Sequence, residues 1–374
     1  MRRSAEPIPH GDIAWRDRLH RLSRDFADVR RSIKRRLGIL APLRIAMYGG
    51  YGTSHEIVLR GRVLEAREGV EPSPEDSPLL NFKRAFWQFE SDEVANVELA
   101  IELLGVGGPP LSVKSDEFGY FLVRHRLESP APSGWLTARA TVTATPYPVS
   151  DLPNAEGRVL IPAPNARFGV ISDIDDTILQ SYVRNRLRLV YLTLAGNPLT
   201  RSSFEGTTEL YRGLREGGHG APFFYVSKSM WNLFPLLEGF ITHQRLPRGP
   251  LLLRQVALFL PRPDVPHKAF AIRELLETYP GLPFLLIGDS GEHDLPLYLE
   301  AARQHPGRVP AILIRNVSPA HRHEAVQRMA EQNVPPGCRV LIFQETQQAI
   351  ELCAELGFWR PAPPKTLPPP RDGS

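Results

Sequence analysis

Cysteine is scarce in this sequence: its 374 residues include two, Cys338 and Cys353. Two cysteines are too few for a disulfide framework, and neither lies in a His/Cys cluster with the spacing of a zinc site. Long apolar runs are also missing. No stretch approaches the roughly 18 apolar residues of a spanning helix, and no apolar segment follows the basic N-terminal residues, as it would in a signal peptide. We therefore expect a cytosolic protein.

The bulk composition is that of a globular protein. Hydrophobic residues make up 42% of the chain and charged residues 23%, close to the averages of soluble domains. At roughly 150 residues per domain, the length predicts two domains and terminal tails. Proline is unusually frequent, with 37 residues, about twice its usual share.

The positive charge is concentrated near the N-terminus. The formal net charge is +4, yet residues 1–37 alone contain eleven Lys/Arg and five Asp/Glu, so the rest of the chain is slightly acidic. Within residues 15–37 the large apolar residues recur every three or four positions, which predicts one amphipathic helix. These residues are Trp15, Leu19, Leu22, Phe26, Val29, Ile33 and Leu37.

Three roles remain open for this basic helix. Its apolar stripe is suited to packing on the body of the protein or to a coiled coil, since the spacing is also that of a heptad seam. Cations on one face and aromatic residues on the other also suit an anionic membrane surface, where the protein would be peripherally bound. Nucleic-acid binding is not expected, because no aromatic platform is interleaved with the cations.

The pattern after the arm changes to that of β-strands. Apolar residues alternate with polar ones over residues 97–103 and 138–144, and Gly-rich and Pro-rich turns separate such stretches, as in an antiparallel β-sandwich. Several prolines over residues 146–164 predict a linker. The predicted organisation is a basic helical arm at 1–42, a β-sandwich domain at 43–150, a catalytic domain at 151–360 and a Pro-rich tail at 361–374.

Strand and helix patterns alternate in the second domain. Such alternation predicts an α/β fold with a parallel sheet covered by helices on both faces. The expected strands span residues 168–172, 222–226, 282–288, 309–314 and 339–343, and the expected helices 231–243, 267–279, 293–305, 320–332 and 346–356.

Acidic and hydroxyl side chains follow three of these strands. The strand ends carry the segments DIDDT (173–177), SKS (227–229) and GDSGEHD (288–294). Because parallel sheets bind ligands beyond the carboxyl ends of their strands, we expect these groups to meet. Crowded carboxylates repel one another unless a cation lies among them, and oxygen ligands without a His or Cys pair favour Mg²⁺. The carboxylates of these segments are therefore candidate metal ligands.

This set of groups suits phosphoryl transfer. A carboxylate beside a bound cation can attack phosphorus and form an aspartyl-phosphate, and a second carboxylate two residues along can protonate the leaving oxygen and then activate water. A hydroxyl and a fixed cation are needed around the phosphoryl oxygens. Ser227 and Lys268 are the candidates for these two groups.

The order of the motifs resembles a known superfamily. A strand followed by DxDxT, a strand followed by Ser, a helix-borne Lys and a strand followed by GDx4D resemble haloacid-dehalogenase-like phosphatases. The segments VISDIDDTI, FFYVSKSMWNLFPLLEGFI, HKAFAIRELLETYPGLPFLLIGDSGEHDLPLY and ILIRNV resemble the actin-patch-associated, magnesium-dependent phosphatidate phosphatase family within it. The resemblance covers roughly residues 165–320 and implies a Rossmannoid parallel sheet.

The resemblance also implies a role for each matched residue. It makes Asp173 the nucleophile and a metal ligand, Asp175 the general acid/base and Asp289 a metal ligand, with Asp294 as the second acid of the last motif. The metal ligands expected from the resemblance are thus Asp173, Asp175, Asp289 and Asp294. Thr177 would steady the loop, Ser227 would bind phosphate, and Lys268 would organise the charges of the site.

The intervals between the motifs leave no room for a large cap domain. A short cap is expected around residues 182–200. An open site favours phosphate on a bulky carrier, and the family implies phosphatidate or a related lipid phosphate. The alternatives are a protein or small-metabolite phosphatase with the same chemistry, or a membrane adaptor with a vestigial phosphatase fold. Intact Asp173, Asp175, Lys268 and Asp289 argue against the adaptor.

Overall fold

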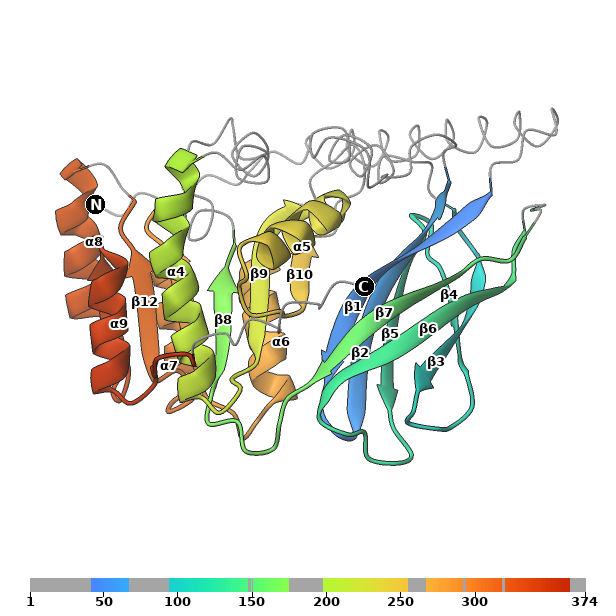
Figure 1. Cartoon of the computed structure of the whole chain (residues 1–374), viewed down its shortest axis with the longest axis horizontal. Coiled ribbons are helices and arrows are strands. Elements are labelled where there is room, and N and C mark those ends of the chain that lie inside the picture. Colours follow the sequence, from blue (N-terminus) through green and yellow to red (C-terminus); the bar gives the residue numbers. More distant parts are fainter. Residues whose placement is uncertain are drawn as a thin grey trace, which may run out of the picture.

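The computed structural model contains two β-sheets joined in one chain (Figure 1). It describes residues 42–66, 94–146, 149, 151–174, 198–254, 267–291, 294–317 and 320–363. The predicted basic helix at 15–37, most of the predicted cap and most of the Pro-rich tail lie outside these ranges. In the described part of the chain, no helix combines the length and the apolar character needed to cross a bilayer.

The N-terminal sheet has seven strands in the order β4-β3-β6-β7-β1-β2-β5. All pairs are antiparallel except β1 with β7, which is parallel. The strands are β1 (Leu43–Gly52), β2 (Glu56–Glu65), β3 (Glu98–Leu104), β4 (Leu111–Lys114), β5 (Tyr120–Arg126), β6 (Gly134–Ala144) and β7 (Asn154–Ile161).

The predicted linker at 146–164 is wrong for most of its length. β7 lies inside it and pairs with both β6 and β1, so this sheet extends past the predicted boundary at residue 150. The prolines of this segment lie outside residues 154–161. Each residue of β7 therefore keeps the backbone N–H group that it needs to pair with a neighbouring strand. The next sheet begins at Gly169.

The antiparallel strands enclose one apolar core. Alternate residues of β3 and β6 point into it, including Leu99, Ile101, Ala138 and Val142, as their period of two predicts. Because all seven strands are hydrogen-bonded into one sheet, the sandwich arrangement itself stays a prediction.

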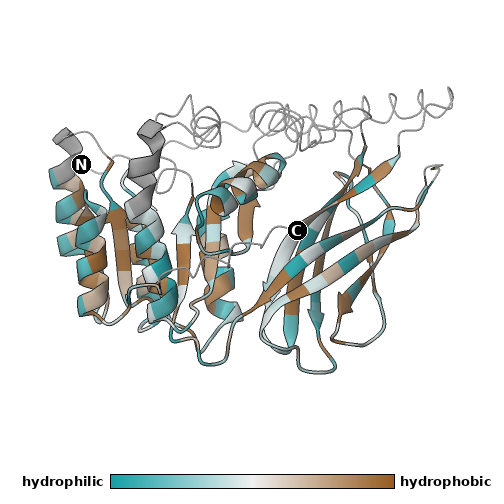
Figure 2. Cartoon of the chain, in the orientation of Figure 1, coloured by the Kyte–Doolittle hydropathy of each residue, from teal (hydrophilic) through white to brown (hydrophobic). Residues whose placement is uncertain are grey.

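The second sheet is parallel throughout, in the order β10-β9-β8-β11-β12-β13. Its strands are β8 (Gly169–Asp173), β9 (Phe223–Met230), β10 (Leu251–Arg254), β11 (Phe284–Asp289), β12 (Ala311–Arg315) and β13 (Arg339–Phe343). The central strands β8, β11 and β12 are buried on both faces, and Figure 2 shows that the strands of this sheet are largely hydrophobic. This burial explains why they are continuous apolar runs without alternation.

Helices cover both faces of the parallel sheet (Figure 1). α4 (Pro198–Gly217), α5 (Phe234–His243) and α9 (Thr346–Glu355) share one core cluster with the sheet, and α6 (His267–Thr278), α7 (Asp294–Gln304) and α8 (Ala320–Gln332) share the other. The helix predicted at 231–243 begins as a 3-10 turn, η1 (Trp231–Leu233), and Pro235 then occupies the first turn of α5, where proline is tolerated. The α/β class is confirmed.

The two sheets are joined by a buried interface. Strands β1 and β2 are buried on both faces, since Tyr48 and Leu64 belong to one cluster of the second domain and Tyr51 and Val58 to the other. The ring of Tyr48 stacks on Trp231 with centroids 4.4 Å apart.

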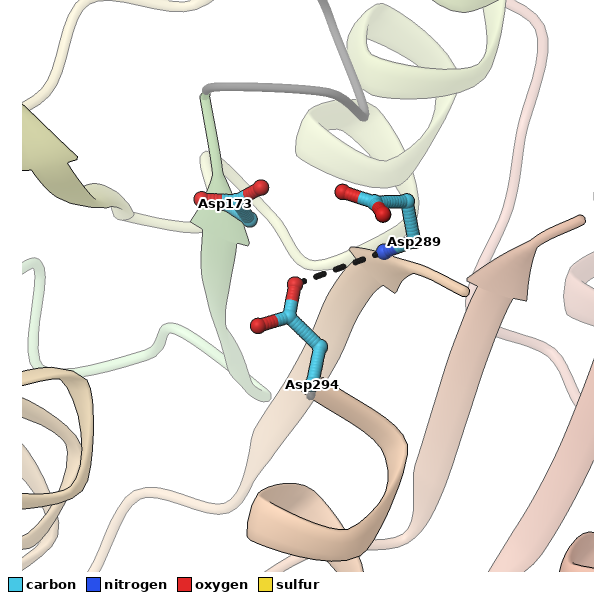
Figure 3. A group of neighbouring side chains, drawn as sticks. All are labelled: Asp173, Asp289 and Asp294. Carbon is cyan, nitrogen blue, oxygen red and sulfur yellow. Dashed lines mark hydrogen bonds between the residues drawn. The ribbon is translucent and has the colours of Figure 1, made fainter. Parts of the chain in front are cut away.

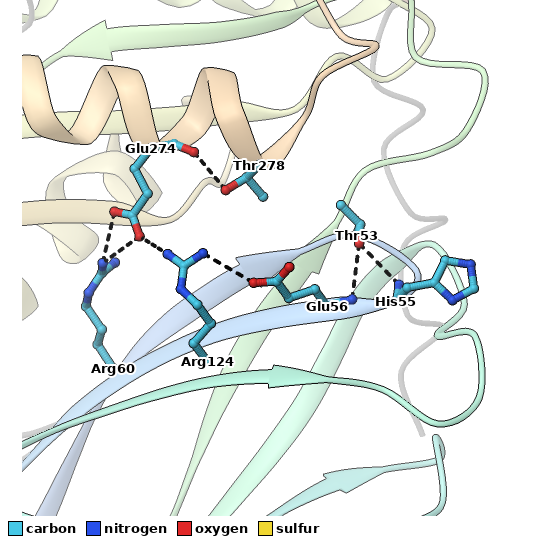
Figure 4. A network of polar contacts seen from close by, with 7 residues as sticks. All are labelled: Thr53, His55, Glu56, Arg60, Arg124, Glu274 and Thr278. Atoms are coloured by element: carbon cyan, nitrogen blue, oxygen red, sulfur yellow. Dashed lines mark hydrogen bonds and ion pairs between the residues drawn. The ribbon is translucent and has the colours of Figure 1, made fainter.

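An ion-pair network completes this interface (Figure 4). Glu274 of α6 accepts hydrogen bonds from Arg60 of β2 and Arg124 of β5, and the Glu274 side chain is 9% exposed. A nearly buried carboxylate held by two guanidinium groups fixes α6 against β2 and the edge strand β5 of the first sheet.

Candidate functional site

Three aspartates converge at the carboxyl ends of neighbouring strands (Figure 3). Asp173 ends β8 and Asp289 ends β11, and these strands are hydrogen-bonded neighbours in the parallel sheet. Asp294 is the first residue of α7, directly after the loop that follows β11. Each aspartate offers an oxygen that lies within 4.8 Å of those of the other two, and all three side chains are buried.

Lys268 brings a positive charge to this cluster from the start of α6. Its Nζ lies 2.9 Å from Oδ1 of Asp173 and 2.8 Å from Oδ1 of Asp294, and its side chain is 2% exposed. A buried ammonium is stable only when opposite charges surround it. Lys268 therefore positions two of the three carboxylates relative to each other.

The backbone after β11 orients the other carboxylate oxygens. Asp289 Oδ1 accepts a 2.6 Å hydrogen bond from the backbone N–H of Gly291. Asp294 Oδ2 accepts a longer one, 3.4 Å, from the N–H of Asp289 (Figure 3). These bonds are made within the GDSGEHD segment itself, so its spacing sets the angle between the two carboxylates.

Gly288 allows the close approach of Asp294 to the end of β11. A Cβ on Gly288 would lie 2.6 Å from Asp294 Oδ2 and 2.8 Å from the ring of Tyr298. Both distances are shorter than real Cβ contacts allow, so Asp294 or Tyr298 would have to move. The glycine of the GD motif is therefore a steric requirement of the acidic cluster.

We expect Gly288→Ala to lower the phosphatase activity that the motifs predict by about 10²-fold, the effect of misplacing a site group by about 1 Å. Overpacking should also reduce the free energy of unfolding by about 1–3 kcal/mol. Steady-state kinetics and urea unfolding measure these effects. Gly281→Ala is the matched control, because an added Cβ there meets no atom within 4 Å. Equal activity of the two variants would contradict this role of Gly288.

Ser227 lies in β9, next to the strand that bears Asp173. Asp173 pairs in register with Val226, the residue before Ser227. The Ser227 side chain is buried, and its Oγ accepts a 2.8 Å hydrogen bond from the N–H of Ser229. A serine hydroxyl at this strand end is the type of donor that the predicted phosphate contact requires.

The structure thus brings together four of the predicted site residues, Asp173, Lys268, Asp289 and Asp294, and places Ser227 on the adjacent strand. Asp175 and Thr177 lie outside the described residues, so their predicted roles stay predictions.

Sequence analysis overlooked two residues that support the site. Tyr298 of α7 is fully buried beneath the aspartates, donates a 3.1 Å hydrogen bond to the carbonyl of Ile287, and has a pKa raised well above its usual value, chiefly by burial. Arg315 ends β12 in register with Asp289, and its guanidinium donates to the hydroxyls of Thr207 and Thr346. In the sequence, Arg315 is recognisable only as a charged residue at the end of the apolar strand β12.

The donor set fits a hard divalent cation. Three carboxylates and one ammonium, all ionised, carry a net charge of −2 in a buried site, which is costly without a counter-charge. All the donor atoms of the cluster are oxygens, the ligands of Mg²⁺ or Ca²⁺. The residues present therefore fit a metal ion, and its identity belongs to the proposal below.

Known proteins match the part of the chain that contains this site. The family model "Phosphatidate phosphatase APP1, catalytic domain" matches residues 168–316. Phosphatidate phosphatase APP1 of Saccharomyces cerevisiae is 32% identical over 172 residues, which cover 43% of this chain and 29% of the yeast protein. An uncharacterised protein of Schizosaccharomyces pombe is 32% identical over 154 residues, covering 40% of this chain and 25% of that protein. The match thus spans less than a third of each curated relative.

A solved structure also matches: a HAD family hydrolase from Deinococcus radiodurans, whose whole length aligns with 53% of this chain at 18% identity and a TM-score of 0.28. The similarity that the motifs predict is confirmed: residues 168–316 match the catalytic-domain model of phosphatidate phosphatase APP1, and this match includes the acidic cluster at the strand ends.

Proposed function

We propose that this protein is a Mg²⁺-dependent phosphatase that hydrolyses a phosphomonoester of the lipid phosphate class through an aspartyl-phosphate on Asp173. The observation that carries the proposal is the buried contact of Lys268 with both Asp173 and Asp294, at 2.9 and 2.8 Å. It holds a potential nucleophile beside a fixed cation, as phosphoryl transfer requires.

In this proposal the carboxylate of Asp173 attacks the phosphorus, and the bond to the alcohol oxygen breaks. Asp175 gives its proton to that oxygen. The Asp175 carboxylate then takes a proton from water, which attacks the phosphorus of the aspartyl-phosphate, so that inorganic phosphate leaves and the Asp173 carboxylate is restored.

The other side chains hold the phosphoryl group during both steps. Lys268 neutralises negative charge beside Asp173, and the Ser227 hydroxyl donates to a phosphoryl oxygen. Asp173, Asp289 and Asp294, with Asp175, would hold Mg²⁺, which supplies further charge neutralisation at the phosphoryl oxygens. Thr177 would keep the segment after β8 in place.

The lipid phosphate is the substrate class favoured by the similarity to yeast phosphatidate phosphatase APP1. A protein or small-metabolite phosphatase would use the same groups with a different alcohol. A membrane adaptor with a vestigial fold needs neither the buried Lys268 nor the aspartates it contacts, and the retained cluster argues against it.

A substrate panel tests this proposal. We expect phosphate release from phosphatidate in mixed micelles to exceed that from phosphopeptides and sugar phosphates in kcat/KM, to cease when EDTA removes divalent cations, and to return with Mg²⁺. A preference for phosphopeptides or sugar phosphates would move the protein to the alternative class. Hydrolysis of none of these esters, with Mg²⁺ present, would refute the proposed activity.

Membrane contact through the basic residues 15–37 is a separate part of the proposal. Those residues lie outside the described ranges, and the argument rests on their amphipathic pattern and charge. Co-sedimentation with anionic vesicles tests this role by comparing the full-length protein with a protein that lacks residues 1–37. Equal vesicle binding of the two proteins at all salt concentrations would contradict membrane contact through these residues.

A further inference from the structure

A cleft of about 420 Å³ lies between the two sheets. Its walls come from β2 and β5 on one side and from η1, β10 and α6 on the other. One of its lining residues, His267, directly precedes Lys268, which contacts Asp173. Leu253 and Trp231 extend the same wall along the carboxyl ends of β10 and β9.

Large apolar side chains are exposed across this cleft. Leu122 of β5 is 53% exposed and Phe270 of α6 is 47% exposed, and both line it. Leu122 lies on the face of β5 turned away from the first core, because its neighbours Phe121 and Val123 are buried there. Phe270 lies one helical turn before Glu274 on α6, and Glu274 faces β2 and β5, where it binds Arg60 and Arg124. Apolar surface of this kind commonly marks a binding site.

The polar side chains that line the cleft are occupied by partners within the protein. Glu274 binds Arg60 and Arg124, and Asp116 accepts from the N–H groups of Phe118 and Tyr120. His267 is hydrogen-bonded to the carbonyl of Leu252 at 3.0 Å, and burial lowers its pKa, which favours the neutral ring. Lys114, at the rim, is exposed. The surface left to a ligand is therefore mainly that of Leu122, Phe270 and their aromatic neighbours.

We propose that this cleft binds an acyl chain of the lipid phosphate, so that the N-terminal sheet selects the alcohol while the second domain performs the chemistry. The inference rests on the proposed phosphatase function. The chain would leave the phosphate over Asp173 and pass between Leu122 and Phe270, and the cleft volume accommodates the segment of the chain nearest the glycerol. A phosphopeptide or sugar phosphate has no apolar group to place there.

Chain-length dependence tests the inference with soluble monomers. We expect kcat/KM with Mg²⁺ to be higher for dioctanoyl than for dibutanoyl phosphatidate, both below their aggregation concentrations. Each buried methylene is worth about fourfold in affinity. Phe270→Ser and Leu122→Ser should each lower the ratio of the two kcat/KM values by about 16-fold, the contribution of two methylenes. The control is Leu152→Ser, because Leu152 is similarly exposed, at 52%, but does not line the cleft. It should leave the ratio unchanged.

The outcomes separate this inference from the phosphatase proposal. Two results would overturn the inference and leave the phosphatase proposal intact. One is a high dioctanoyl-to-dibutanoyl ratio of kcat/KM in the wild type that neither cleft variant lowers. The other is a wild-type ratio of one. Because Leu122 and Phe270 lie on different elements, a folding defect in one variant leaves the test to the other, with thermal melting as the check.

If the wild type hydrolyses neither ester, the phosphatase proposal fails, and binding alone tests the cleft. A dioctanoyl phosphatidate with a diazirine on one chain should label residues 120–126 or 267–278 after irradiation. Labelling confined to other parts of the chain would refute the inference.

Discussion

Replacing Asp173 with Asn is expected to abolish phosphate release from every phosphomonoester, including a soluble aryl phosphate, with a loss of at least about 10³-fold in kcat. The amide keeps the shape of the side chain but is too weak a nucleophile to attack phosphorus, and removal of a nucleophile commonly costs several orders of magnitude. The measurement is steady-state phosphate release with Mg²⁺ present. Acid quenching after a short incubation with ³²P-labelled substrate should leave label on the wild type and none on the variant.

The control for this substitution is Asp151→Asn, because Asp151 is exposed and precedes β7 of the first sheet, whereas the acidic cluster lies on the second sheet. It should retain wild-type activity. Activity of Asp173→Asn within tenfold of the wild type would contradict the nucleophile assignment. Label retained on the variant would place the phosphoryl group on another residue.

Replacing Lys268 with Met should have the largest effect on stability. In the absence of metal the variant leaves Asp173, Asp289 and Asp294 buried without the ammonium that contacts two of them. Breaking a buried ion pair by removing one partner costs about 3–5 kcal/mol. We expect that loss in the free energy of unfolding, measured by urea denaturation in EDTA, and loss of activity as well. Mg²⁺ should restore part of the stability, because it neutralises the same carboxylates.

Lys114→Met is the matched control, since Lys114 is exposed on β4 and such surface changes usually stay within about 0.5 kcal/mol. Equal unfolding free energies for Lys268→Met and the wild type in EDTA would show that the carboxylates do not need this counter-charge. Failure of Mg²⁺ to stabilise Lys268→Met would argue against the acidic cluster as the metal site.

The parallel sheet and its helices were predictable because the central strands are buried on both faces. Continuous apolar runs such as 284–288 and 311–314 then differ plainly from the amphipathic helices between them. The predicted helices at 267–279, 320–332 and 346–356 match α6, α8 and α9 to within a residue. The acidic cluster was predictable for a related reason: carboxyl ends of neighbouring parallel strands meet at one edge.

β7 was missed because its flanking prolines looked like a linker. What makes residues 154–161 a strand is the hydrogen bonding offered by its neighbour β6 and by β1, which lies about a hundred residues earlier. Gly288 was seen only as part of a motif, since its steric role depends on where α7 places Asp294 and Tyr298. Arg315 contacts hydroxyls on two helices, α4 and α9, that lie far from it in sequence or beyond the next strand. Each of these features depends on how separate elements pack in three dimensions.

The sequence by itself determined the α/β class, the order of the catalytic motifs and the family they resemble, because residue spacing and local periodicity record which side chains follow each strand. The tertiary structure decided that Lys268 contacts both Asp173 and Asp294, and that β1 and β2 pack on the second sheet and its helices. A cleft between two domains has no local signature, since its walls come from strands and helices more than a hundred residues apart.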